Sequence, residues 1–337
     1  MGFTGGILPD TAIKELFADN AIISKQALDN DQIQPASIDL RLGSCAYRLR
    51  ASFLPGSGNL VADMLQPPLV MHKIDLSKGA VLETGCIYLV PLLEALQLPT
   101  NISGRANPKS STGRIDVFTR VICDNGISFD TVKAGYHGPL WIEICPRTFS
   151  ILARTGDRLA QLRLRAQQAI KEKNQQTLTV SISLPKTGLA GYRAKRHSGV
   201  LDLSGIGSHS QADYWEPLTT KQGSLILDPG EFYILASKED IVIPPNMAAE
   251  MAPTATDIGE FRVHYAGFFD PGFGMAGAAS KAVLEIRGRD VPFLLTDGQD
   301  IARLVFEPMQ SKPATLYGSN TSHYQGQGLK LSKLFKR

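Results

Sequence analysis

Short runs in which apolar and polar residues alternate recur along the chain, with glycine and proline between them. In residues 37–42 every second residue is apolar, a pattern typical of a half-buried β-strand. Similar runs fill residues 81–104 at close spacing, which indicates a barrel or a sandwich of strands. Residues 7–17 differ, because their pattern predicts a short helix with Asp10 as its N-cap.

Four blocks of sequence occur twice, in the same order. The paired blocks begin around Gly85 and Gly230, Pro99 and Pro244, WIEI (141–144) and VLEI (283–286), and 155–162 and 297–304. The first two pairs are 145 residues apart and the last two are 142 apart. Such repetition predicts a tandem duplication of one β-domain. Residues 171–192 are polar and glycine-rich, so we place the boundary here and expect domains 1–188 and 189–337.

Composition agrees with a soluble globular protein of about two domains. The chain has 337 residues, of which 43% are hydrophobic and 20% charged, enough to bury a sizeable core. A net charge of +3 is too weak to indicate nucleic-acid binding. The first residues do not form a signal peptide, and no apolar run approaches a membrane span. The four cysteines are scattered without a CxxC motif, which favours a reduced, cytoplasmic protein.

Residues 262–286 combine turn chemistry with a single acid. Two strand-like runs flank Asp270-Pro271-Gly272, in which proline presets φ and glycine accepts a positive φ. The returning run carries one carboxylate, Glu285. A hairpin of this kind could enclose a small planar ligand, and it could equally be an ordinary hairpin with a surface glutamate.

A second candidate site lies in NPKSSTGR (107–114). Lys109 and Arg114 supply positive charge around a turn, and Ser110 and Ser111 supply hydroxyl donors. Such a cluster suits phosphate oxygens. The alternative is a solvated polar turn, since two cations in a turn are common on protein surfaces.

Together these motifs resemble the dCTP deaminases, members of the trimeric dUTPase-like superfamily. AGFFDPGF (266–273) followed by VLEI resembles the family's base-binding hairpin. SSxxR stands eleven residues after Pro99, as in the family, and YQGQ (324–327) resembles its C-terminal lid. The resemblance implies a mainly β fold of two tandem dUTPase-like, distorted, jelly-roll-like β-barrels with a few short helices.

The two repeats depart from the family pattern in complementary ways. In the second repeat the SSxxR positions are Ala255, Thr256 and Gly259, whereas in the first repeat the hairpin 123–138 lacks the Asp-Pro-Gly turn. Family sites lie between neighbouring barrels. We therefore expect the second domain to supply the base pocket and the first domain the phosphate turn. The alternative is that one repeat has decayed completely.

The implied activity is zinc-free deamination of dCTP to dUTP and ammonia, which would supply dUTP for thymidylate synthesis. Zinc deaminases carry HxE and PCxxC motifs, which this chain lacks. By resemblance Glu285 is the general acid/base, and Ser110 and Arg114 orient the water. Ala266 would contact the base through its backbone, Asp270 the 3′-hydroxyl and Phe273 the sugar. Further substrate contacts implied are Lys109, Ser111, Gly267, Tyr317, His323, Tyr324 and Gln327. Glu143 is the alternative catalytic acid.

The resemblance also bears on partners and alternatives. Magnesium would bind through the triphosphate rather than through protein side chains, and no zinc is expected. The partners would be dCTP and dUTP in a homo-oligomer, with a trimer and sites between chains slightly favoured. dUTP pyrophosphatase, a bifunctional deaminase–pyrophosphatase and a non-catalytic nucleotide-binding regulator stay open. The roles of His264 and His323 also stay open. The basic residues 330–337 are expected to form a solvated tail, with an extra anchor as the alternative.

Overall fold

The computed structural model describes residues 5–167, 176–253, 261–263, 267–275, 280–319 and 324–336. Within these residues the prediction of a mainly β fold is confirmed, since strands dominate and the helices are short. The helical elements are α1 (Asp10–Ala18), α2 (Ser110–Gly113), α3 (Gln211–Tyr214) and the 3-10 turn Ala62–Met64. A search of the described helices finds none with the length and hydropathy needed to cross a membrane.

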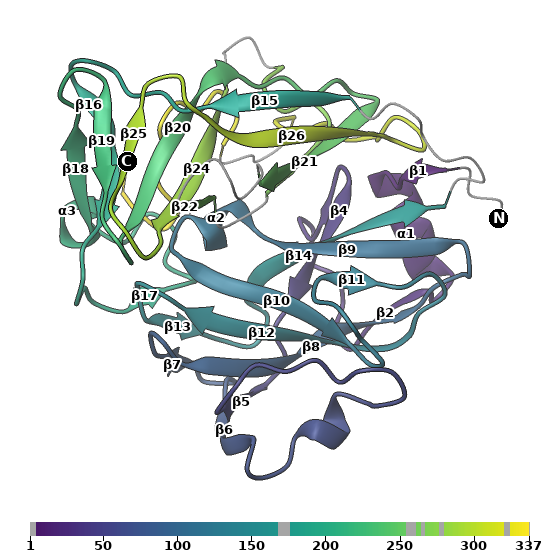
Figure 1. Cartoon of the computed structure of the whole chain (residues 1–337). Helices are drawn as coiled ribbons and strands as arrows, with labels where there is room; N and C mark the ends of the chain where they lie inside the picture. The colour runs from purple at the N-terminus through teal and green to yellow at the C-terminus, as the bar shows by residue number, and fades with distance from the viewer. Residues whose placement is uncertain are drawn as a thin grey trace.

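The N-terminal half is built on two large sheets and a small third one (Figure 1). The first sheet contains, in spatial order, β11 (Thr131–Val132), β9 (Ile102–Pro108), β14 (Arg158–Ala166), β4 (Ser37–Arg41) and β3 (Ile33–Gln34), with β1 (Gly6–Ile7) pairing on β14. The second contains β10 (Val117–Cys123), β12 (His137–Pro146), β8 (Ile87–Gln97), β5 (Cys45–Leu49) and β6 (Val70–Asp75), with β2 (Ile22–Ser24) pairing on β8. The third joins β13 (Ile151–Ala153) and β7 (Ala80–Leu82) of this half to β17 (Leu201–Asp202), which follows residue 188.

The C-terminal half has a similar arrangement. One sheet contains β15 (Thr177–Ser181), β26 (Asp300–Pro308), β21 (Met247–Pro253) and β23 (Phe268–Phe269). The other contains β18 (Trp215–Thr219), β16 (Leu189–Ala194), β20 (Phe232–Asp240), β24 (Lys281–Gly288) and β22 (Phe261–Val263). A two-stranded sheet joins β19 (Ser224–Leu227) and β25 (Phe293–Thr296).

The repeated sequence blocks form corresponding strands in the two halves. β8 pairs with β12 as β20 pairs with β24, and β9 pairs with β14 as β21 pairs with β26, all antiparallel. β15 precedes the boundary expected at residue 188, yet it pairs with β26 of the C-terminal half. The division at residue 188 and the tandem duplication stay predictions.

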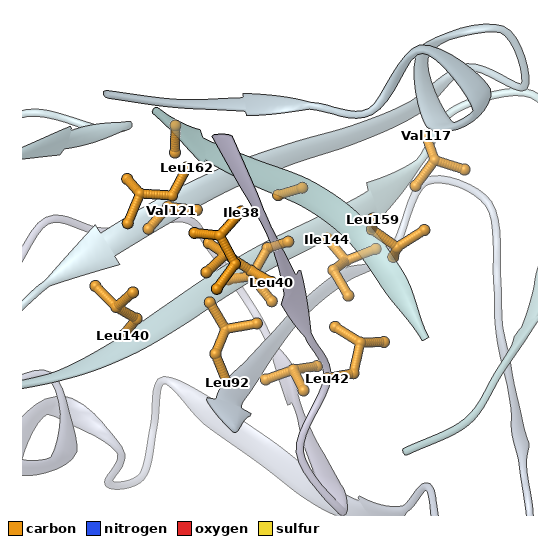
Figure 2. Packing of buried hydrophobic residues seen from close by; sticks show 14 of the residues in the cluster. Ile38, Leu40, Leu42, Leu92, Val117, Val121, Leu140, Ile144, Leu159 and Leu162 are labelled. Atoms are coloured by element: carbon orange, nitrogen blue, oxygen red, sulfur yellow. The ribbon is translucent and has the colours of Figure 1, made fainter. Parts of the chain in front are cut away.

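The core of the N-terminal half lies between its two large sheets. Figure 2 shows leucines and isoleucines from β4 and β14 facing side chains from β8, β10 and β12. Ile38 and Leu40 of β4 are almost fully buried, and Leu42 follows directly after the strand. Regular alternation places these apolar residues on one face of the pleated strand.

β4 is buried more deeply than the sequence pattern predicted. Its polar residues were expected on an exposed face, yet all five residues of the strand are buried. Arg41 forms a hydrogen bond of 2.8 Å with Glu94, and Asp39 forms an ion pair with Lys109. Buried charges are tolerated when they are paired in this way. The expected N-cap is also wrong, since Pro9 occupies that position and the Asp10 carboxylate accepts hydrogen bonds from the loop at 314–315.

The two halves share part of their hydrophobic core. The cluster between the N-terminal sheets continues into Trp215, Phe232 and Val283 of the C-terminal half. Phe149 contacts Trp215 edge to face at 5.4 Å between ring centroids. The halves therefore pack through apolar side chains, and this contact fixes the position of the cavity that lies between them.

Candidate active site

A cavity of about 910 Å³ lies where the two halves meet. The N-terminal half contributes α2, which follows β9, and the loop before β3. The C-terminal half contributes the turn after β23, the middle of β24 and the chain after residue 315. A pocket of this volume suits a ligand of nucleotide size.

Arg114 is the N-terminal half's main contribution to the centre of this cavity. It ends α2 and its side chain is only 2% exposed. Its terminal nitrogens donate hydrogen bonds to the carbonyl of Lys330 at 2.9 Å and to Gln327 Oε1 at 3.0 Å. The guanidinium also lies over the ring of Tyr324, 4.0 Å from the centroid. These contacts hold the charge in one orientation, and its buried Nε has no hydrogen-bond partner among the residues that the structure describes.

Glu285 faces Arg114 from the other half. It lies in the middle of β24, opposite Ile234 of β20, and is 5% exposed. Its Oε1 is 3.9 Å from Arg114 Nε, which is longer than a direct hydrogen bond. Burial raises the pKa of Glu285 to about 8, although Arg114 opposes the shift. The carboxyl group can therefore exchange a proton near neutral pH.

The hairpin turn is anchored to the N-terminal half by Arg163 of β14. This buried arginine donates to the carbonyl of Ala249 at 3.0 Å and to Asp270 Oδ1 at 3.2 Å. Its guanidinium lies 4.0 Å from the centroid of Phe268. Burial raises the pKa of Asp270, while the neighbouring Arg163 opposes that rise. Arg163 thus fixes both the strand before the turn and the acid at its start.

The turn itself depends on glycine. Gly272 has a φ of +94°, and a Cβ there would lie 2.9 Å from the Cβ of Leu316. Only glycine combines that conformation with so close an approach. The turn thereby packs Phe273 against Tyr317, with ring centroids 5.5 Å apart. These two aromatic side chains form an apolar wall of the cavity.

The outer end of the cavity is rich in charge. Lys109 forms an ion pair with Asp39, and Arg158 forms ion pairs with Asp29 and Asp31. Ser110 and Ser111 line the same cavity at the start of α2. Sequence reasoning found Lys109 and both serines but missed Asp39 and Arg158, which are distant in the chain and come together only through the pairing of β4 with β14.

The C-terminal tail, residues 330–337, of which the structure describes 330–336, is packed differently from the expectation. It was predicted to be solvated, but Leu331, Leu334 and Phe335 are buried. Ser332 Oγ donates to the carbonyl of Ser111 at 3.0 Å, so the tail also touches the phosphate turn. In LSKLF (331–335) the spacing of the three apolar residues would fit one buried face. This spacing is the sequence signal that could have predicted the packing.

The structure brings most of the predicted site residues to one cavity. The cavity is lined by Lys109, Ser110, Ser111, Arg114, Gly267, Asp270, Phe273, Glu285, Tyr317, Tyr324 and Gln327. All of these come from a single chain, so one chain brings both halves of the expected composite site to the same cavity. The slightly favoured formation of sites between chains stays a prediction. Ala266, His264 and His323 lie outside the described residues, as do Ala255, Thr256 and Gly259.

Glu143, the alternative acid, is not brought to this cavity. It lies on β12 and is paired across the sheet with Arg120, whose Nε donates to it at 3.0 Å. Arg120 also donates to Ser52 at 2.6 Å and lies 3.7 Å from the centroid of Phe129. Glu143 is thus held in an ion pair inside the N-terminal half, packed beside the residues that follow β5.

Comparisons with known proteins agree over almost the whole chain. Residues 4–168 match the model of the 2′-deoxycytidine 5′-triphosphate deaminase N-terminal domain, and residues 153–335 match that of the C-terminal domain. Among curated proteins, the chain is similar to "dCTP deaminase, dUMP-forming" of Coprothermobacter proteolyticus, with 31% identity over 41% of this chain and 69% of that protein. It is also similar to "dCTP deaminase" of Halorubrum lacusprofundi, with 27% identity over 46% of this chain and 75% of that protein.

A solved structure resembles the chain more extensively. The 2′-deoxycytidine 5′-triphosphate deaminase from Agrobacterium tumefaciens is 52% identical in sequence and superposes with a TM-score of 0.87. The match covers 92% of this chain and 99% of that one. Both halves and the cavity between them therefore lie within the region of similarity.

Proposed function

Because the chain belongs to the 2′-deoxycytidine 5′-triphosphate deaminase family, we propose that it hydrolyses dCTP to dUTP and ammonia at the cavity between its halves. The observation that carries this proposal is the pair formed by Arg114 and Glu285. A buried carboxyl group with a raised pKa faces a rigidly held guanidinium beside the SSxxR turn. Perturbed acids in a cavity of nucleotide size are typical of catalytic sites.

In the proposed reaction, a water molecule adds to carbon 4 of the cytosine ring. Glu285 takes one proton from this water and delivers it to ring nitrogen 3, then takes the proton of the added hydroxyl group and delivers it to the departing amino group. The carbon–nitrogen bond breaks, ammonia leaves, and the ring retains the oxygen as the carbonyl of uracil. Arg114 Nε and Ser110 orient the water and stabilise the charge that develops on its oxygen. Arg114 suits this role because Gln327 and Lys330 fix the rest of its guanidinium.

Selection of the deoxynucleoside is proposed to depend on the hairpin turn. Asp270 would accept a hydrogen bond from the 3′-hydroxyl, and Phe273 would lie where a 2′-hydroxyl would clash. Support comes from the anchoring of Asp270 by Arg163 and from the packing of Phe273 against Tyr317. A pocket whose walls are held in this way can exclude a ligand that is one hydroxyl larger.

The triphosphate is proposed to lie along Lys109, Ser110 and Ser111. Magnesium would accompany it, held by phosphate oxygens and water. The nearest carboxylates fit this arrangement, because Asp39 is already paired with Lys109, and Asp29 and Asp31 with Arg158. Among the residues that the structure describes, no three His, Cys, Asp or Glu side chains are grouped as metal ligands. The proposed mechanism uses Glu285 in place of zinc.

A second candidate is a bifunctional reaction that ends at dUMP. It is favoured by the name of the relative from Coprothermobacter proteolyticus, which describes a dUMP-forming dCTP deaminase. Release of pyrophosphate would distinguish the two products. A regulator without catalytic activity is disfavoured, because the Glu285 carboxyl group is costly to bury and lies 3.9 Å from Arg114, too far for a direct hydrogen bond.

The test is to incubate the purified protein with dCTP and magnesium and to measure ammonia, dUTP, dUMP and pyrophosphate. Glu285→Gln should bind dCTP and lose about 10²–10⁴-fold in rate, because an amide cannot accept the proton. Glu143→Gln should remain active per folded molecule. An active Glu285→Gln with an inactive Glu143→Gln would overturn the assignment. Inhibition by a strong zinc chelator with magnesium in excess would overturn the zinc-free route.

A further inference from the structure

The backbone of the C-terminal tail is fixed on both sides of Lys333. Its N–H donates to the hydroxyl of Tyr324 at 3.1 Å, and its carbonyl accepts from Gly207 N at 3.0 Å. Further along, Phe335 packs edge to face on Trp215, with ring centroids 5.9 Å apart. The backbone at Lys333 is therefore held in place, and the fold sets the point from which its side chain extends.

The side chain of Lys333 lines the cavity at its charged outer end. Burial lowers the pKa of Lys333, and the positive charge of Lys109 lowers it further, against the opposing influence of Asp39 and Asp31. Of these neighbours, Lys109 belongs to the phosphate turn, Asp39 to β4 and Asp31 to the loop before β3, and none belongs to the Glu285 end of the cavity. Lys333 is thus placed where the phosphates of a bound nucleotide would lie.

Lys333 differs from the other cations at this end in having no acidic partner. Lys109 and Arg158 are each paired with an aspartate. No carboxylate of the described residues lies within ion-pair distance of the Lys333 ammonium group. A half-buried lysine beside a second lysine is unfavourable by itself, and an anion placed between them removes that cost.

We propose that Lys333 is a phosphate-binding residue, by which the C-terminal tail neutralises the triphosphate held at the Lys109–Ser111 turn. This inference rests on the proposed function, since it takes the nucleotide to bind with its base at Glu285. The compact ammonium group on a long side chain contacts phosphate as a point charge. The segment that holds Arg114 through the Lys330 carbonyl would then also contact the triphosphate.

The proposal is tested by Lys333→Gln, with Lys336→Gln as the matched control in the same tail. Lys336 is exposed and its side chain does not line this cavity. We expect Lys333→Gln to raise KM for dCTP about ten-fold with kcat nearly unchanged. Binding of dCMP should change little, and Lys333→Arg should restore most of the affinity. Lys336→Gln should behave as wild type.

Titration with inorganic tripolyphosphate separates this inference from the proposed function. Wild-type protein should bind it more tightly than Lys333→Gln even if no deamination is seen, a result that would overturn the proposed function alone. Equal binding of tripolyphosphate by both proteins would overturn the role of Lys333. An equal loss of dCTP and dCMP binding in Lys333→Gln would also overturn it, because a merely structural change weakens both ligands.

Discussion

Glu285 is the proposed acid/base, and its buried position is unfavourable for the charged form of its carboxyl group. Its pKa is about 8 in the folded chain against a usual value of 4.5. Between these pH values the native state keeps a proton that the unfolded chain has lost. Stability therefore falls as pH rises through this window, by about 1.4 kcal/mol for each unit of pKa difference, and levels off above pH 8.

Removal of this titrating group should make the protein more stable at neutral pH. Glu285→Gln has no proton to lose, so its melting temperature should rise above that of wild type, and the gap should widen from pH 5 to pH 8. Thermal denaturation followed by circular dichroism at several pH values measures the gap. If the melting temperatures of the two proteins changed by the same amount at every pH, the raised pKa of Glu285 would be contradicted.

Glu143→Gln should instead make the protein less stable. Glu143 is paired with Arg120 at 3.0 Å, so the substitution leaves a largely buried cation without its counter-charge, although the amide oxygen can still accept a hydrogen bond. Loss of one member of such a pair typically destabilises a protein by about 3–5 kcal/mol. The two glutamates occupy corresponding strands, but Glu143 is hydrogen-bonded to its arginine through Oε1, whereas Glu285 lies 3.9 Å from Arg114.

At the scale of elements, the C-terminal tail connects several parts of the site. Its carbonyl at Lys330 holds Arg114, Ser332 holds the phosphate turn, and Phe335 packs on Trp215. Each apolar side chain that the tail buries contributes about 1.5–3 kcal/mol. Removal of the tail should therefore disturb the site and the joint between the halves together.

Truncation after Gly328 should lower both the melting temperature and kcat sharply. The shortened chain loses the acceptor for Arg114 and exposes the aromatic side chains beneath Phe335. Truncation after Phe335 is the control, because it removes only the last two residues and should have little effect. Wild-type stability and turnover in the chain ending at Gly328 would show that the tail is dispensable, as the sequence alone suggested.

The elements that the sequence predicted correctly are those with local signals. The Asp-Pro-Gly turn and the strand alternation of residues 37–42 depend on backbone preferences and spacing within a few residues. The burial of β4 and of the tail depends on distant partners. Asp39 is buried because Lys109 reaches it from 70 residues away, and Arg163 meets Asp270 from 107 residues away. Such pairs cannot be read from one sequence, because charged residues are usually exposed.

The whole molecule is organised so that each half completes the other. Arg163 of the N-terminal half is buried against the hairpin of the C-terminal half, and Arg287 of the C-terminal half is paired with Asp116 of the N-terminal half. Separation of the halves would leave these buried charges unpaired, which is strongly unfavourable. Arg114 and Glu285 meet across the same joint. The site and the joint therefore depend on the same contacts.

This arrangement predicts the result of mixing two inactive variants. Arg114→Ala and Glu285→Gln each damage one half of the site, and the structure places both halves in one chain. Co-refolded mixtures should therefore stay inactive at every ratio, since each chain carries one lesion. If an oligomer instead formed its sites between chains, about a quarter of the sites in an equal mixture would combine two intact halves and activity would return. Assay at several protein concentrations makes the distinction sharper, because a site formed within the chain keeps its specific activity on dilution. Recovery of activity in the mixture would show that the functional site joins Arg114 of one chain to Glu285 of another.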